Sequence, residues 1–306
     1  MNTKILNGDC IEMMRTLPEK SINCCVTSPP YYGLRDYGHE GQIGLEETPD
    51  AFVQKLVEVF REVKRVLKDD GTLWLNLGDS YVGTGAKGEH KDPKHPEGRN
   101  AQSDTPKNNK VAGLKSKDLI GIPWRVAFAL QSDGWYLRQD IIWHKPNPMP
   151  ESVQDRCTKA HEYIFLLSKC SKYYYDIEPI REDIKPTSGK INGAPLRGEH
   201  ILECGGRKTE KREYEEIKGA NKRSVWSVNT KSYDGAHFAT YPPELIRPCI
   251  LAGCPKGGVV IDPFGGSGTT AAVANEEGRD AVLCEINPEY ISLINKRLSE
   301  VQPKLF

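Results

Sequence analysis

The sequence predicts an α/β fold with a mostly parallel, twisted sheet that is covered by helices on both faces. Short apolar runs alternate with longer runs whose apolar residues recur at helical spacing. A glycine-rich turn, GGSG at 265–268, joins one apolar run to the next helical run. This alternation is typical of β-α-β units, which build parallel sheets. With 306 residues, of which 38% are hydrophobic, the chain can bury the core of one large domain or two smaller ones.

The elements can be placed in chain order from their periodicity. In the first half, strands are expected at 3–8, 21–28, 71–79, 135–145 and 161–169, and helices at 10–17, 49–71 and 119–134. Gly71 and Gly134 are expected to end the second and third of these helices, because glycine commonly follows the last helical residue. The second half predicts a helix over 237–253, a strand over 259–262, a helix from Thr269, a strand over 280–286 and a final helix.

Two polar segments interrupt this alternation. Residues 83–118 are rich in glycine, proline and lysine and contain almost no large apolar residue, which predicts a long flexible loop. Residues 179–235 mix basic residues with glutamate. We therefore expect one α/β domain in two parts, 1–178 and 236–306, with the segment 179–235 inserted between them.

The composition excludes several classes of protein. No run of about eighteen apolar residues occurs, so no membrane span is expected, and the opening MNTKILNGDC carries no apolar export signal. Nine cysteines at irregular spacing, with no CxxC pair, predict a reducing, cytoplasmic location and no metal site. The net charge is zero, so any contact with a nucleic acid must come from local basic patches.

The run VTSPPYYG at 26–33 ends a predicted buried strand in a rigid segment. Ser28 and Pro29 each precede a proline, so both are restricted to extended conformations, and neither proline has an N–H. The Pro29 carbonyl and the Ser28 hydroxyl are therefore two acceptors on a stiff backbone, which fit the two hydrogens of an exocyclic amine. We expect the ring of Tyr31 to stack on the face of the same base, with Tyr32 as a second aromatic.

The run GGVVIDPFGGSGTT at 257–270 predicts a cofactor site. A strand ends at Asp262, glycines then allow the backbone to turn sharply, and the next strand ends at Glu285, whose carboxylate can bind both hydroxyls of a ribose. A phosphate-binding loop would carry a lysine before its serine or threonine, and this turn has none. The carboxylate of Asp262 would also repel a pyrophosphate. These features favour S-adenosylmethionine, which carries a sulfonium and an ammonium but no phosphate.

Together, TSPPYY and DPFGGSGTT resemble the DNA amino-methyltransferases, in particular the permuted group in which the catalytic motif precedes the cofactor motif. The resemblance covers the chain outside 83–118 and 179–235. It implies the Rossmann-like fold of S-adenosylmethionine-dependent methyltransferases, acting on a base flipped out of double-stranded DNA. It also implies that 179–235 is the target-recognition region, and it makes a restriction endonuclease of a restriction-modification system a candidate partner.

The resemblance assigns roles to particular residues. The catalytic residues are Ser28, Pro29, Pro30 and Tyr31. Gly8-Asp9 matches a pair whose carboxylate binds the adenine amino group, and HFATYPPELI matches the helix that closes over the methionine end. The backbone N–H of Cys10 could touch the adenine, or Cys10 could only pack at a helix start. The cofactor-binding residues are Asp9, Cys10, Phe238, Asp262, Pro263, Phe264, Gly265, Gly266, Gly268, Thr269 and Glu285.

The resemblance also bears on the target base. Serine at the first motif position is commoner among N4-cytosine enzymes and aspartate among N6-adenine enzymes, so Ser28 favours N4 of cytosine. A neutral serine can also donate a hydrogen bond to N3 of cytosine. N6 of adenine is the alternative. Methylation of an RNA or protein amine is a more distant one, because glutamine-modifying enzymes carry a similar motif after the cofactor motif instead of before it.

Basic residues of the inserted segment are candidates for contacts with DNA phosphates, together with residues beside the predicted base pocket. These candidates are Tyr32, Lys145, Arg207, Lys208, Arg212, Lys222 and Arg223. Glutamates in the same segment could instead neutralise its basic residues on a solvated surface. Trp143 and His144 could line the path of the DNA or simply pack.

Other reactive side chains are expected to be structural. Pro248-Cys249 resembles the nucleophile pair of the cytosine carbon-5 enzymes, but it lies in an apolar, helix-like stretch, so we expect a buried cysteine. Cys24 and Cys25 lie inside a predicted strand and are expected in the core. His90 and His95 lie in the polar loop, where solvated side chains are expected instead of metal ligands.

Overall fold

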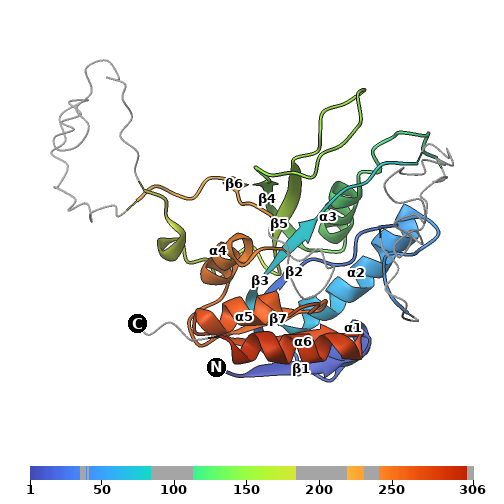
Figure 1. The fold of residues 1–306 in the computed structure, drawn as a ribbon. Coiled ribbons are helices and arrows are strands. Elements are labelled where there is room, and N and C mark those ends of the chain that lie inside the picture. The colour runs from blue at the N-terminus through green and yellow to red at the C-terminus, as the bar shows by residue number, and fades with distance from the viewer. Residues whose placement is uncertain (35–38, 40, 84–112, 184–218, 231–240, 302–306) are drawn as a thin grey trace, which may run out of the picture.

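The computed structural model describes the chain except for residues 35–38, 40, 84–112, 184–218, 231–240 and 302–306 (Figure 1). Within the described residues the strands form one eight-stranded sheet, in the order β1-β8-β7-β2-β3-β5-β4-β6. The strands are β1 Thr3–Asn7, β2 Ile22–Thr27, β3 Leu67–Leu77, β4 Tyr136–His144, β5 His161–Ser168, β6 Val225–Ser227, β7 Val259–Asp262 and β8 Asp280–Glu285. The helices are α1 Cys10–Arg15, α2 Pro49–Val66, α3 Ile122–Ser132, α4 Pro243–Gly253, α5 Thr269–Glu276 and α6 Pro288–Ser299, with a 3-10 turn at Glu178–Ile180. None of these described helices is long and apolar enough to cross a membrane.

The sheet is mostly parallel, as predicted. Among the described strands, five of the seven pairings are parallel, and β5 runs antiparallel to both β3 and β4. The segment between β4 and β5 contains no helix, so the chain turns back beside β4 without the crossover that a parallel neighbour requires.

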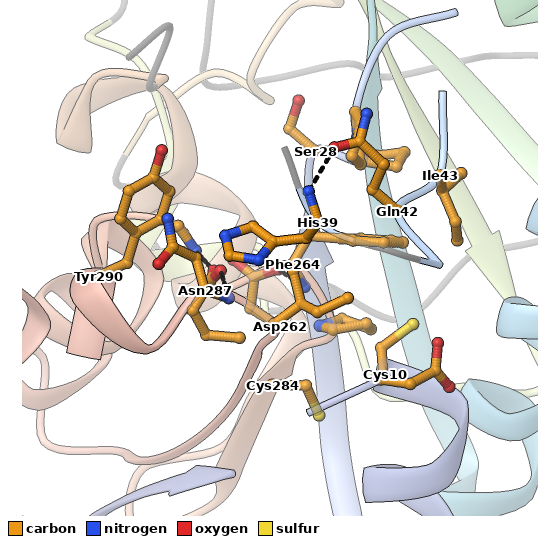
Figure 2. A pocket seen from close by; sticks show the side chains of 18 of the residues that line it. Cys10, Ser28, His39, Gln42, Ile43, Asp262, Phe264, Cys284, Asn287 and Tyr290 are labelled. Carbon is orange, nitrogen blue, oxygen red and sulfur yellow. Dashed lines mark hydrogen bonds between the residues drawn. The ribbon is translucent and has the colours of Figure 1, made fainter. Parts of the chain in front are cut away.

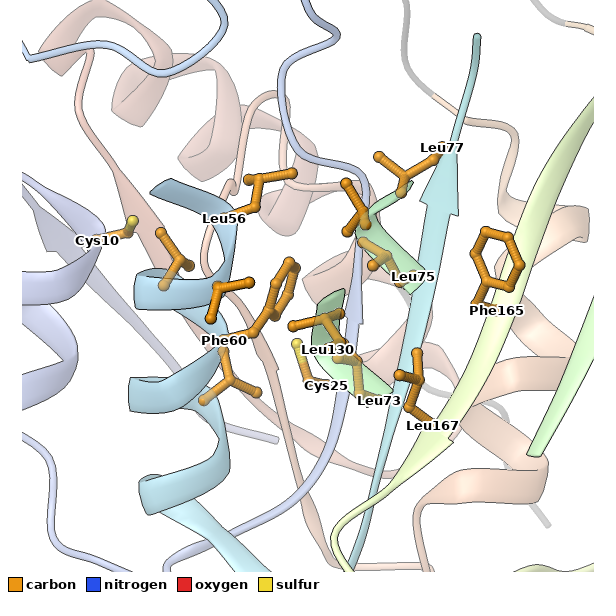
Figure 3. Close-up of a cluster of buried hydrophobic side chains, with 14 of the residues drawn as sticks. Cys10, Cys25, Leu56, Phe60, Leu73, Leu75, Leu77, Leu130, Phe165 and Leu167 are labelled. Atoms are coloured by element: carbon orange, nitrogen blue, oxygen red, sulfur yellow. The ribbon is translucent and has the colours of Figure 1, made fainter. Parts of the chain in front are cut away.

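Alternation along the central strands builds a core on each face of the sheet. In β3, Leu73, Leu75 and Leu77 contribute to the core beneath α1, α2 and α3, whereas Trp74 contributes to the core beneath α4, α5 and α6. Figure 3 shows the first core, in which Leu56 of α2 points toward β3. Each fully buried leucine stabilises the fold by about 1.5–3 kcal/mol. Both faces are therefore covered, as the alternation of elements predicts.

The helix expected over 49–71 ends earlier, at Val66, so its predicted C-terminus is wrong. Leu67 is already extended (φ −67°, ψ 141°) and pairs with Ile22 of β2. Gly71 lies inside β3, where a Cβ atom would come 3.0 Å from Cβ of Leu67. Leu67 satisfies both the helical spacing and the strand pattern, so spacing alone could not locate the boundary.

The helix expected over 237–253 begins later, at Pro243. Pro242 is extended (ψ 147°), because the proline that follows it disfavours the helical conformation. The residues 237–240 of that expected helix lie outside the described part of the chain.

The strand order places a switch point between β7 and β2. β7 continues through α5 on one face to β8, whereas β2 continues through α2 on the other face to β3. Because the two connections leave in opposite directions, a crevice opens at the carboxyl ends of these strands, where open α/β sheets bind ligands. Thr27 of β2 and Asp262 of β7, which are 235 residues apart in sequence, are hydrogen-bonded there.

Candidate active site

A pocket lies at the carboxyl ends of β2, β7 and β8 (Figure 2). Its wall combines the segment after β2, the turn between β7 and α5, the start of α1 and the segment after β8. From the two sequence motifs it is lined by Ser28, Pro29, Pro30, Tyr31, Asp262, Pro263, Phe264, Gly265, Gly266, Ser267 and Thr269. The fold therefore brings the predicted catalytic and cofactor motifs into one cavity.

The Ser-Pro-Pro segment is held against the cofactor turn by the residue that precedes it. Thr27 is fully buried, and its hydroxyl donates to Oδ1 of Asp262 at 2.6 Å. Pro29 is buried, whereas Ser28 is partly exposed at the pocket wall. Because β2 and β7 are neighbours and this hydrogen bond joins their ends, Ser28 has little freedom to move away from the turn.

The two tyrosines of the motif are placed differently. Tyr31 lines the pocket, and its hydroxyl donates to Oε2 of Glu162 at 2.6 Å. Tyr32 is only 4% exposed and packs against Phe52, with ring centroids 5.5 Å apart. This burial contradicts the prediction that Tyr32 contacts the base or DNA. Tyr32 instead anchors the segment in the core while Tyr31 faces the cavity.

The glycine turn brings bare backbone to the pocket wall. A Cβ atom on Gly265 would lie 3.2 Å from a carbonyl oxygen of β8, so the turn packs closely on that strand. Gly266 has a φ of +51°, in the left-handed region that favours glycine, and donates to Oε2 of Glu285 at 2.7 Å. Gly268 (φ +79°) packs on Ile294 of α6 and is not among the described residues that line the pocket. Gly268 therefore packs the start of α5 on α6, and its contact with the cofactor stays a prediction.

Asp262 is buried at the pocket wall, and its carboxylate accepts four hydrogen bonds. Oδ1 accepts from the Thr27 hydroxyl and the Phe264 backbone N–H, at 2.6 and 3.0 Å. Oδ2 accepts from the hydroxyls of Tyr241 and Thr270, at 2.9 and 2.6 Å. Burial raises the pKa of Asp262 to about 6, although these hydrogen bonds favour the ionised form. Asp262 thus brings charge to the pocket while protein donors occupy its lone pairs.

Two further carboxylates line the cavity with acceptor capacity to spare. Glu285 ends β8 and accepts backbone N–H groups from Gly266 at 2.7 Å and Asn287 at 2.8 Å, one on each oxygen. Each oxygen keeps a second lone pair, which suits the predicted pair of ribose hydroxyls. Burial raises the pKa of Glu285. Asp9 accepts two backbone N–H groups of the first turn of α1, and this cap fixes its carboxylate at the pocket wall.

The cysteines near the site are buried. Cys10 lines the pocket and also belongs to the core, and burial raises its pKa to about 12. Cys24, Cys25 and Cys249 are buried in the sheet and in α4, and burial raises the pKa of each thiol. The expectation that these three are structural is confirmed, and a thiol held protonated in this way is not a nucleophile.

The pocket wall carries negative charge, which determines the kind of ligand that it can bind. Asp9, Asp262 and Glu285 all line it, and no lysine or arginine does so among the described residues. Such a wall repels phosphate groups and favours a cationic ligand. No group of three or more His, Cys, Asp or Glu side chains in the described ranges is arranged to hold a metal ion, and His90 and His95 lie outside those ranges.

The predicted DNA contacts differ in how the structure places them. Lys145 forms an ion pair with Glu162, and its side chain is only 18% exposed, so its contact with DNA stays a prediction. Lys222 and Arg223 both pair with Glu182, at 3.6 and 2.8 Å, and of the two only Arg223 is well exposed, at 75%. The predicted residues that lie outside the described part of the chain are Arg207, Lys208, Arg212 and Phe238.

Sequence reasoning missed residues that complete the cavity. His39 and Gln42 lie over it from the segment after β2, and Asn287 and Tyr290 close it at the start of α6 (Figure 2). Tyr241 lines it from the segment before α4. The sequence NPEY directly after the β8 carboxylate could have revealed the α6 pair, since the start of a helix that follows a strand lies at the same sheet edge. Tyr241 belongs to the run HFATYPPELI, which the resemblance had already placed over the methionine end, whereas no pattern in the sequence marks His39 and Gln42.

Comparisons with known proteins agree with this geometry. The DNA methylase family model for N6 and N4 methyltransferases matches residues 22–296. The chain is 50% identical over 295 residues to the type II methyltransferase M.Cfr9I of Citrobacter freundii. This match covers 96% of this chain and 87% of that protein. The solved PvuII DNA methyltransferase (cytosine-N4-specific) has a TM-score of 0.65 at 19% identity, covering 100% of this chain and 89% of that chain. A putative DNA modification methylase of Thermus thermophilus, TTHA0409, complexed with S-adenosyl-L-methionine, has a TM-score of 0.58 at 23% identity, covering 100% and 98%.

Proposed function

We propose that this chain, which belongs to the family of N6 and N4 DNA methylases, is a site-specific methyltransferase for N4 of cytosine. Family membership makes it an enzyme that transfers a methyl group from S-adenosylmethionine to an exocyclic amine of DNA. One observation carries the proposal: the segment from Ser28 to Tyr31 and the turn that follows Asp262 line a single pocket.

The residues of the pocket fit S-adenosylmethionine. The cofactor supplies an electrophilic methyl group on a sulfonium and carries no phosphate. The carboxylates of Asp9, Asp262 and Glu285 would balance its positive charges, and those of Asp9 and Glu285 would also bind its polar groups. Glycine at 265 and 266 leaves the backbone bare for close approach. The ring of Phe264, which lies in the cavity, offers a face for an adenine (Figure 2).

Ser28 and the carbonyl of Pro29 would hold the amino group that accepts the methyl. The exocyclic amine of a base is a weak nucleophile, because its lone pair is delocalised into the ring. Two acceptors on its N–H groups would draw the nitrogen toward tetrahedral geometry and direct its lone pair at the methyl group of the cofactor. Orientation of this kind can lower a barrier by about 7–11 kcal/mol. The base must leave the duplex to reach the pocket, where Tyr31 would stack on it.

Ser28 supports cytosine over adenine as the target base. A hydroxyl can accept one N–H of the amino group and donate to the neighbouring ring nitrogen N3, which an ionised aspartate cannot do. The PvuII enzyme, which is named as cytosine-N4-specific, shares the fold of this chain.

We assign target recognition to the inserted segment 179–235. Its first described part contributes Glu182, which forms an isolated bridge with Ala220 and pairs with Arg223. M.Cfr9I and M.SmaI, each 50% identical to this chain, are named as type II methyltransferases. This similarity supports a role in restriction-modification, with an endonuclease of matching specificity as partner and the cytoplasm as the compartment.

Methylation of unmodified, mixed-sequence DNA with labelled cofactor, followed by mass analysis of the nucleosides, tests the proposal. N4-methylcytosine is the expected product. N6-methyladenine would overturn the choice of base, and 5-methylcytosine would overturn transfer to an amine. A reaction with RNA or protein but not DNA would overturn the substrate. The Ser28→Ala variant is the control, since it should lose the same product while it still binds the cofactor.

A further inference from the structure

A group of polar side chains lies behind the ring of Tyr31, outside the residues that line the pocket. The Tyr31 hydroxyl donates to Oε2 of Glu162 at 2.6 Å and lies 3.4 Å from Oδ1 of Asn76. Glu162 is the second residue of β5, and Asn76 lies near the end of β3 beside it. The tyrosine is therefore bound at its far end to the sheet.

Glu162 is itself held in place. Its Oε1 pairs with Lys145, and its Oε2 also accepts from Asn76 at 3.3 Å. The Glu162 and Lys145 side chains are only 13% and 18% exposed, and Lys145 lies 4.3 Å from the centroid of the buried Trp143 ring. Asn76 also donates to the Tyr163 carbonyl at 3.0 Å, which fixes its amide. A partly buried ion pair with further hydrogen bonds is a rigid acceptor, because each of its members has few alternative partners.

The ring of Tyr31 is confined from a second side by Gly78, which follows β3. A Cβ atom on Gly78 would lie 2.5 Å from Cε2 of Tyr31 and 3.1 Å from both Cδ2 and Cζ. Because glycine has no Cβ atom, the ring of Tyr31 can occupy this space. The φ angle of Gly78 is not in the left-handed region, so the backbone would accept alanine and only the ring would be displaced.

We propose that Glu162 and Gly78 are positioning residues that lock the ring of Tyr31 in one orientation for stacking on the flipped base. This inference rests on the proposed function, in which Tyr31 holds the base that receives the methyl group. A phenol ring turns about two side-chain torsions. The hydroxyl contact to Glu162 and the surface of Gly78 restrain both torsions before any base enters. The orientation of the base then depends on contacts made by the sheet.

The restraint matters because transfer needs the amine aligned with the methyl group. Misplacement of a reacting group by about 1 Å can cost on the order of 100-fold in rate. If the Tyr31 ring loses its hydroxyl contact while Tyr32 still holds the segment in the core, we expect the ring to move by less than about 1 Å. We expect a loss of about tenfold in the rate of transfer, with no change in cofactor affinity, since neither residue lines the cofactor wall.

A double-mutant cycle between Tyr31→Phe and Glu162→Ala tests the inference. The readout is the single-turnover rate of labelled methyl transfer into mixed-sequence DNA, with the Kd of the cofactor measured by calorimetry. Each single variant is expected to lower the rate about tenfold, and the double variant should lower it no further, because both changes break the same contact. Glu162→Gln should recover most of the rate, since its carbonyl oxygen can accept the same hydrogen. Multiplicative losses would show that Glu162 acts independently of Tyr31 and would overturn the proposal.

Two further variants keep the test decisive if Glu162→Ala does not fold. Gly78→Ala should slow transfer about tenfold or more without changing cofactor Kd, and a wild-type rate would contradict the inference. Glu151→Ala is the matched control, because Glu151 forms a similarly part-buried ion pair with Arg156 that does not touch Tyr31. Total label in DNA reports on positioning whichever base is modified. The identity of the methylated nucleoside separately tests the proposed function.

Discussion

Replacing Asp262 with asparagine is expected to remove about 2 kcal/mol of pH dependence from the stability of the fold between pH 4 and pH 7. Burial raises the pKa of this carboxyl from 3.8 to about 6. An acid with a raised pKa binds its proton more tightly in the folded state, so its stabilising effect is complete below pH 3.8 and is lost as pH rises through about 6. At about 1.36 kcal/mol per pKa unit, the full difference is about 3 kcal/mol, most of which falls within that window.

The measurement is urea unfolding at several values between pH 4 and pH 7, for the wild type and for Asp262→Asn. Subtracting the two unfolding free energies at each pH cancels the titration of every other group. The stability of the wild type relative to the variant should fall by about 2 kcal/mol as pH rises. Asp50→Asn is the matched control for the chemical change, because the side chain of Asp50 is 84% exposed. A difference between wild type and Asp262→Asn that stays constant within about 0.5 kcal/mol would refute the reasoning from burial.

Four further outcomes follow from the described contacts. Ser28→Ala should slow single-turnover methyl transfer about 100-fold, as loss of one aligned hydrogen bond in a transition state does, while calorimetry shows unchanged cofactor affinity. Glu285→Gln should weaken cofactor binding by about 10- to 100-fold in the same titration, because it removes the charge from hydrogen bonds worth about 1.5–3 kcal/mol each. Thr27→Val should lower the unfolding free energy by about 1.5–3 kcal/mol in urea, because it removes the donor on Oδ1 of Asp262; a change below about 0.5 kcal/mol, on the order of an ordinary surface substitution, would contradict this. Arg223→Ala should reduce the slope of log affinity for DNA against log salt by about one if this exposed residue meets a phosphate, and an unchanged slope would remove it from the interface.

The two motifs and their strand ends could be predicted from the sequence because their chemistry is local. Proline pairs restrict the backbone wherever they occur, so the rigid segment after β2 does not depend on its neighbours. The left-handed conformation of Gly266 and the carboxylate of Glu285 at the end of β8 likewise follow from short patterns. The parallel sheet follows from the alternation of elements. The predicted end of α2 was wrong because Leu67 satisfies both the helix and the strand pattern. The predicted start of α4 was wrong because a proline pair was included in the helix.

Contacts between distant segments could not be predicted, because the residues that make them carry no mark in their own neighbourhood. Tyr31 and Tyr32 are adjacent and identical, yet one faces the pocket and the other packs on Phe52. Lys145 was expected on DNA from its charge and position, but its partner Glu162 comes from the next strand. Only the pairing of β4 with β5 brings these two charges together.

The sequence by itself determined the fold class, the chemistry of both motifs and the nature of the cofactor. These depend on backbone restriction and on residue type, which each short segment carries with it. The tertiary structure alone decided that the two motifs share one cavity, that the oxygens of Asp262 are occupied by Thr27 and Tyr241, and that Tyr31 is held from behind. Those facts arise from strand order and packing, which place residues at hydrogen-bond distance without regard to their separation along the chain.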